Sequence, residues 1–129
     1  MQDYLSDLYK KLSGKMKLGL ERSRMLMELL DHPEKSFPSI HVAGTNGKGS
    51  VTALAASLLE AGGLKVGRFT SPHLVKFNER ITVNGTAIPD EAIKIYLRSW
   101  ESYLEETKAS FFEVTCALAF AYFRDMGVD

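Results

Sequence analysis

Residues 39–50, which read SIHVAGTNGKGS, place a short apolar segment before a glycine-rich turn that carries one lysine and one hydroxyl. Gly44, Gly47 and Gly49 let the backbone take left-handed angles and turn several amide N–H groups toward one point, which makes a nest for an anion. We expect a strand before this turn and a helix that begins at Gly49 or Ser50. The positive end of that helix would add to the nest.

Lys48 and Ser50 supply the side chains for phosphate chemistry. Lys48 offers a mobile positive charge for the β- and γ-phosphates of a nucleotide, and the Ser50 hydroxyl offers a ligand for a magnesium ion. The pattern departs from the usual phosphate loop, because Val42 stands where a first glycine is expected and Gly49 stands directly after the lysine. The loop still predicts a phosphate site, with Lys48 as the candidate catalytic residue.

The loop sequence GTNGKGS resembles the variant phosphate loop of the Mur ligase superfamily, whose ATP-dependent enzymes join an amino acid to a carboxylate. Within it the chain is most similar to folylpolyglutamate synthase and dihydrofolate synthase. Three further stretches carry the resemblance: LGLER at 18–22, TSPHL at 70–74 with FNERI at 77–81, and FE at 112–113. The resemblance implies ATP and Mg²⁺ as cofactors, with the nucleotide bound by Gly44, Thr45, Asn46, Gly47, Lys48, Gly49 and Ser50.

The resemblance also implies the fold and the reaction. We expect an α/β protein, a P-loop-containing three-layer fold with a mostly parallel sheet that is truncated before the sheet is complete. Residues 1–129 would be the N-terminal portion of the ATP-binding domain, with a helical lead-in at 1–36, a P-loop α/β unit at 37–129 and the C-terminal domain absent. The implied substrates are a folate or dihydropteroate and L-glutamate, joined through an acyl phosphate, and this piece alone is expected to be inactive.

Further residues are assigned by the same resemblance. Ser71 is implied as a magnesium ligand beside Ser50, and because neutral hydroxyls hold magnesium poorly, we expect a carboxylate to join them. Six residues are implied to face the substrates: Leu18, Gly19, Leu20, His73, Phe112 and Glu113. Structural alternatives stay open, namely a plain interhelix turn at 18–20, orientation of its own loop by His73, and a buried, paired carboxylate at Glu113.

The composition narrows the function classes. Sixteen basic residues balance sixteen acidic ones, so nothing favours a nucleic-acid surface or an anionic membrane. The single cysteine, Cys116, excludes an internal disulfide and fits a reducing compartment. No apolar run reaches membrane-spanning length and no export signal is visible. We expect a cytoplasmic monomer that acts on small molecules.

Apolar spacing predicts helices at 4–12, 20–30, 50–61, 90–104 and 111–126. Strands are expected at about 39–42 and at 65–70, a short peripheral hairpin at 81–88, and the start of another strand at 128–129. A strand, helix and strand in this order are joined by a right-handed crossover, so the first two strands should be parallel. Ligands bind beyond the carboxyl ends of such strands, and the loop at 44–50 and the segment 70–73 should therefore face one site.

Two other functions remain open. One is a P-loop kinase for a small molecule, in which the phosphoryl group stays on the acceptor; the spacing in Lys48-Gly49-Ser50 and the TSPHL stretch argue against it. The other is a nucleotide-binding or regulatory module without catalysis, which the missing magnesium carboxylate favours for a chain of 129 residues.

Overall fold

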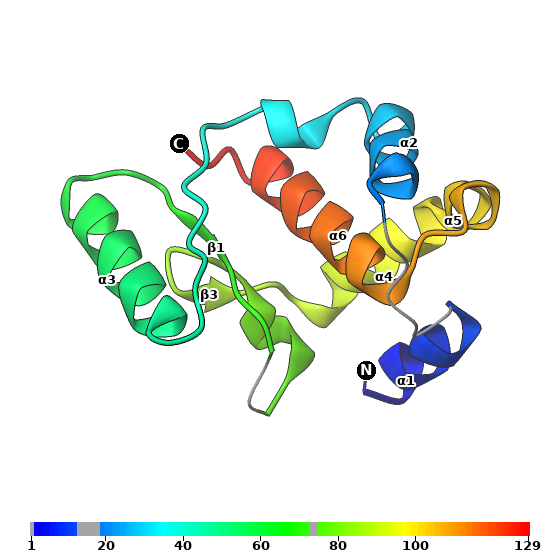
Figure 1. The fold of residues 1–129 in the computed structure, drawn as a ribbon, viewed down its shortest axis with the longest axis horizontal. Helices are drawn as coiled ribbons and strands as arrows, with labels where there is room; N and C mark the ends of the chain where they lie inside the picture. The colour runs from blue at the N-terminus through cyan, green and yellow to red at the C-terminus, as the bar shows by residue number, and fades with distance from the viewer. Residues whose placement is uncertain (1, 13–18, 73–74) are drawn as a thin grey trace.

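The computed structural model describes residues 2–12, 19–72 and 75–129. Helices surround a central helix, and a small sheet lies on one side of it (Figure 1). In chain order the elements are α1 (Gln2–Lys11), α2 (Glu21–Leu29), η1 (Pro33–Lys35), α3 (Lys48–Ala61), β1 (Gly67–Phe69), η2 (Phe77–Arg80), β2 (Ile81–Val83), β3 (Thr86–Ala87), α4 (Asp90–Ser99), α5 (Glu101–Thr107) and α6 (Phe111–Asp125).

Helix α6 is the element around which the others pack, and Figure 1 shows it in the middle of the molecule. It is apolar on nearly every side, and nine of its 15 residues are buried. A helix that is apolar all round must be covered on all sides. It ends where Gly127 takes a φ of +67° and the Val128 N–H donates to the Phe123 carbonyl oxygen. The predicted helix at 111–126 is confirmed to within one residue.

The three strands form one antiparallel sheet in the order β1-β2-β3. Asn84 and Gly85, with φ of +46° and +80°, make the tight turn between β2 and β3, because a two-residue turn of this type needs left-handed angles at both positions. The predicted hairpin is confirmed, but its predicted peripheral position is wrong. Strand β2 is the central strand, and all three of its residues are buried.

The predicted strand at 39–42 is not formed in the described part of the chain. These residues carry no regular structure and pair with no strand, and the Ile40 side chain is 70% exposed. Parallel strands are stable when neighbours pair with them and both faces are covered, and neither condition is met here. The expected parallel pairing with 65–70 is therefore absent, and β1 pairs only with the antiparallel β2.

The last residue lies beside the start of the predicted second strand. The Asp129 N–H donates to the Lys65 carbonyl oxygen at 2.8 Å, and the Lys65 N–H donates to Asp129 Oδ2 at 2.8 Å. The chain after α6 therefore runs next to the segment that leads into β1. This is the position at which the sequence predicts another strand to begin.

One predicted helix is two helices in the structure. The segment expected as a helix at 90–104 is broken at Trp100, which ends α4 and precedes α5. Trp100 is buried, and its ring centroid lies 5.4 Å from that of Tyr96. The break between the two helices therefore falls at a buried aromatic residue.

Helix α3 lies at the edge of the molecule (Figure 1). It begins at Lys48, one or two residues before the predicted start, and ends at the predicted glycine pair, where Gly63 has a φ of +89°. Ala56 is its only buried residue, whereas Val51, Leu54 and Leu58 are exposed on one side. Among the described residues no helix is both long and apolar enough to cross a membrane.

Candidate functional site

The glycine-rich loop leads directly into α3. Gly44 and Gly47 have φ of +148° and +75°, angles that a residue with a side chain rarely adopts. In the described chain no side chain caps this helix end, and the first helical hydrogen bond runs from the Val51 N–H to the Gly47 carbonyl oxygen. The amides of Lys48, Gly49 and Ser50 at the start of the helix therefore remain available as donors.

The loop also leaves room for a ligand. A Cβ atom placed at Gly47 or Gly49 would meet nothing within 4 Å, and every residue from 44 to 50 is exposed. Amide donors, the positive end of a 14-residue helix and the charge of Lys48 all act at this point. The donor set therefore fits the phosphates of a nucleotide.

Ser50 and Ser71 were predicted to bind magnesium, and both are exposed. Ser50 lies in the first turn of α3 and Ser71 follows β1, which contacts α3. Figure 1 shows the start of α3 and the end of β1 at the same lower edge of the view. The described residues contain no group of three or more His, Cys, Asp or Glu side chains suited to a metal. Magnesium usually keeps several waters and phosphate oxygens, and two hydroxyls supply only part of its shell.

The six residues predicted to face the substrates differ in position and exposure. Leu18 and His73 lie outside the described residues. Gly19, with a φ of +102°, turns the chain into α2, and the Leu20 side chain that follows is 62% exposed. Phe112, in the first turn of α6, is 50% exposed. Leu20 and Phe112 are thus two large apolar side chains that remain free to contact a ligand.

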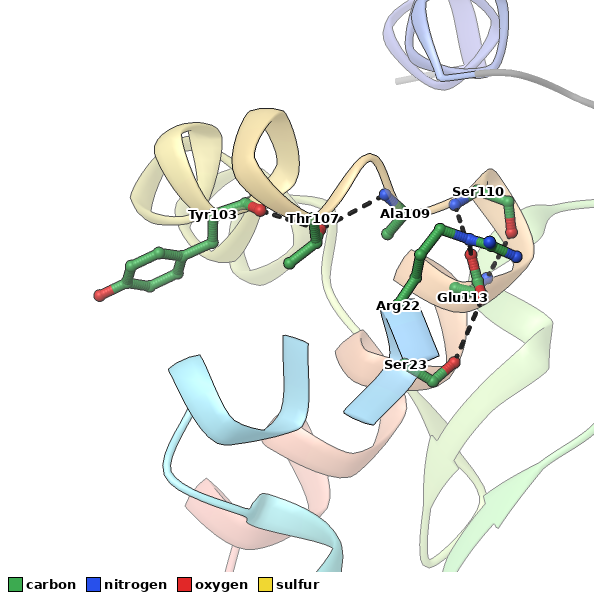
Figure 2. Close-up of polar contacts among 7 residues, drawn as sticks. All are labelled: Arg22, Ser23, Tyr103, Thr107, Ala109, Ser110 and Glu113. Atoms are coloured by element: carbon green, nitrogen blue, oxygen red, sulfur yellow. Dashed lines mark hydrogen bonds and ion pairs between the residues drawn. The ribbon is translucent and has the colours of Figure 1, made fainter. Parts of the chain in front are cut away.

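Glu113 differs from these two residues because protein donors occupy its carboxylate (Figure 2). Oε1 accepts from the Ser110 N–H at 2.8 Å and from Arg22 Nε at 3.0 Å, and Oε2 accepts from the Ser23 hydroxyl at 3.4 Å. The Ser110 hydroxyl in turn accepts from the Glu113 N–H at 3.3 Å, which completes a capping box at the start of α6. The contacts match the structural alternative, a buried and paired carboxylate.

The direction of the pKa shift of Glu113 agrees with this pairing. Burial alone would raise the pKa of Glu113, but the hydrogen bonds from Ser110 and the ion pair with Arg22 outweigh burial and hold the pKa below its usual range. Burial of Cys116, together with the nearby Glu113 charge, raises the pKa of its thiol to about 11. Cys116 therefore carries no reactive thiolate at neutral pH.

Two side chains in the segment 77–81 form hydrogen bonds with backbone groups. Glu79 Oε1 accepts from the N–H groups of Val75 and Lys76, each at 2.7 Å, and Asn78 Nδ2 donates to the Ile88 carbonyl oxygen at 2.6 Å. These contacts hold the turn that enters β2. The matching residues Asn78 and Glu79 thus have structural roles in this chain.

Sequence reasoning missed Arg22, Ser23 and Ser110 as partners of Glu113. The spacing Ser110-x-x-Glu113 is a capping-box signature and would have pointed to one of them. No local signal could reveal Arg22, which lies 91 residues away along the chain.

Comparison with known proteins shows what kind of chain has this geometry. No family model matches it. A dihydrofolate synthase/folylpolyglutamate synthase from Bacillus subtilis is 43% identical over 130 residues, covering 96% of this chain and 30% of that protein. The Mycobacterium tuberculosis folylpolyglutamate synthase complexed with ADP and AMPPCP has a TM-score of 0.88 at 37% identity, covering 99% of this chain and 30% of that one. E. coli FolC in complex with DHPP and ADP has a TM-score of 0.90 at 35% identity, covering 99% and 31%.

Sequence and fold together define the class as Mur-ligase-like α/β proteins, so the predicted fold class is confirmed although the strands described here are antiparallel. Within that class, this chain is a homologue of the folylpolyglutamate and dihydrofolate synthases. It spans about 30% of the length of each of these three relatives.

Proposed function

We propose that the protein carrying this chain is an ATP-dependent ligase that adds L-glutamate to the carboxylate of a folate or a dihydropteroate through an acyl phosphate. The observation that carries the proposal is the loop at 44–50, which presents uncapped amides, an exposed Lys48 and open space at the start of α3. Relatives of this chain are named as synthases of this kind, and solved relatives hold ADP or AMPPCP.

In this proposal the loop stabilises the phosphoryl group during its transfer. The amides of Lys48, Gly49 and Ser50 and the Lys48 ammonium act on the charge that spreads over the phosphate oxygens. Such donors are effective because they are in place before the reaction and need no rearrangement. We also propose that a magnesium ion takes the Ser50 and Ser71 hydroxyls as two of its ligands.

The pterin-bearing substrate is proposed to lie against Gly19, Leu20 and Phe112, together with Leu18 and His73. The exposed ring of Phe112 offers an aromatic face on which a flat heterocycle can stack. One solved relative is a complex with DHPP and ADP, which supports a second ligand in addition to the nucleotide. The balanced charge supports small-molecule substrates rather than nucleic acid, and the single cysteine supports a reducing compartment such as the cytoplasm.

The test is a product assay on the synthase that contains residues 1–129, supplied with ATP, L-glutamate and either dihydropteroate or a folate. We expect an amide product and ADP, both of which require all three substrates. The matched sample is the isolated chain of residues 1–129, which we expect to form no amide. A phosphorylated acceptor that accumulates without amide would indicate a kinase, and nucleotide binding without turnover would indicate a non-catalytic module.

A further inference from the structure

An ion pair joins the two segments that we propose to hold the pterin-bearing substrate. Arg22 lies two residues after Leu20 at the start of α2, and Glu113 follows Phe112 at the start of α6. We propose that Arg22 is a positioning residue, which acts through Glu113 to set the spacing between the exposed side chains of Leu20 and Phe112. This inference rests on the proposed function.

The α6 side of the pair is held in place by its own surroundings. The capping box with Ser110 fixes the Glu113 carboxylate, and the link before Ser110 is ordered by Thr107, whose hydroxyl donates to the Tyr103 carbonyl oxygen at 2.9 Å and accepts from the Ala109 N–H at 3.3 Å (Figure 2). The Phe111 ring packs at 5.2 Å from that of Tyr9, measured between centroids. The start of α6 is therefore held in one position by its own contacts.

The start of α2 has no comparable capping box among the described residues. Leu20 occupies the N-cap position of α2 and, within the described chain, no side chain caps this helix. Gly19 has a left-handed φ, and the Leu20 side chain is exposed. The Arg22 contact at 3.0 Å, with the weaker Ser23 contact at 3.4 Å, joins the start of α2 to the start of α6.

The ion pair between Arg22 and Glu113 has the properties of a contact that fixes the relative position of two helices more than of one that adds stability. The side chains of Arg22 and Glu113 are only 20% and 9% exposed, so each charge has lost most of its water. Arg22 Nη2 is buried and has no partner among the described residues, which is unfavourable. Buried ion pairs often add little net stability and are best attested as groups that fix relative position.

The experiment compares four variants of the full-length synthase: Arg22→Ala, Glu113→Gln, the double variant, and Arg24→Ala as the matched control. Arg24 is an exposed arginine on the same helix. We expect Arg22→Ala and Glu113→Gln each to raise the KM for the pterin-bearing substrate roughly 10- to 100-fold, while the KM for ATP changes less than about twofold. The KM for the pterin-bearing substrate in the double variant should be no higher than in the poorer single variant, because both changes remove the same contact. Arg24→Ala should behave as the wild type.

Three outcomes would overturn the inference. Equal changes in both KM values would mean a general structural role. Additive losses in the double variant would mean that Glu113 binds substrate independently of Arg22. An unchanged KM for the pterin-bearing substrate in Arg22→Ala would remove any positioning role. If Arg22→Ala does not fold, Arg22→Lys replaces it, because lysine keeps the charge but lacks the planar donor geometry; the same selective rise in KM is expected. A wild-type enzyme that forms no amide would instead overturn the proposed function.

Discussion

The Phe123 ring of α6 lies directly against the backbone of Gly67 in β1. A Cβ atom built at Gly67 would come within 2.6 Å of Phe123 Cδ1 and 2.7 Å of Cε1. Real side chains do not approach this closely, so only glycine permits the contact. The sheet and the central helix are thus packed together at a position without a side chain.

Gly67→Ala should therefore lower the free energy of unfolding by about 1–3 kcal/mol, because the buried Phe123 ring must shift to make room. Denaturant unfolding of the purified chain measures this change. Gly49→Ala is the matched control, since its Cβ meets nothing within 4 Å and it lies inside α3. That variant should be as stable as the wild type or more stable, by up to about 1 kcal/mol. Equal effects at both positions would contradict the packing argument.

Lys48→Ala should weaken nucleotide binding in the full-length synthase roughly 10- to 100-fold, because a charged donor to the phosphates is lost. The free energy of unfolding should stay within about 0.5 kcal/mol of the wild-type value, since the side chain is exposed. Calorimetric titration with a nucleotide gives the affinity. Lys35→Ala, another exposed lysine outside the loop, is the control and should bind nucleotide normally. Wild-type affinity in Lys48→Ala would show that another group binds the phosphates.

Ser71→Ala tests the proposed magnesium ligand. We expect the magnesium concentration at half-maximal activity to rise roughly tenfold, on the scale of one lost metal contact, while the KM for glutamate changes little. A titration of activity against magnesium measures it. Ser57→Ala, which removes an exposed hydroxyl from the outer part of α3, should leave the magnesium curve unchanged. If the Ser71→Ala curve coincides with the wild-type curve, Ser71 is not a ligand.

The Glu113 carboxylate makes stability depend on pH in a defined direction. Its pKa in the folded protein lies below the ordinary value of 4.5, so the unfolded chain binds this proton first as the pH falls. The stabilisation from Glu113 is therefore fully present near neutral pH and is lost as the pH drops through about 4.5 and below. We expect Glu113→Gln to be less stable by about 1–3 kcal/mol at neutral pH, with the difference shrinking in acid. Unfolding curves recorded from pH 7 to pH 3 would contradict this if the two proteins stayed equally far apart.

The amino-acid sequence by itself determined the local features of this protein. The loop at 44–50, the glycine pair that ends α3, the turn at Asn84-Gly85 and the extent of α6 all follow from residues that are neighbours along the chain. Backbone angles, helix ends and apolar periodicity depend on such short-range chemistry. This part of the fold, including the glycine-rich loop that leads into α3, could therefore be predicted.

Tertiary structure alone decided which elements meet. Neighbouring residues do not show that β2 takes the centre of the sheet, that 39–42 lacks a strand partner, or that the helix breaks at Trp100. Arg22 and Glu113 form the clearest case, because the sequence presents them as two separate motif residues 91 positions apart. Their pairing depends on how α2 packs against α6, and the free energy of that packing is summed over contacts between residues distant in sequence.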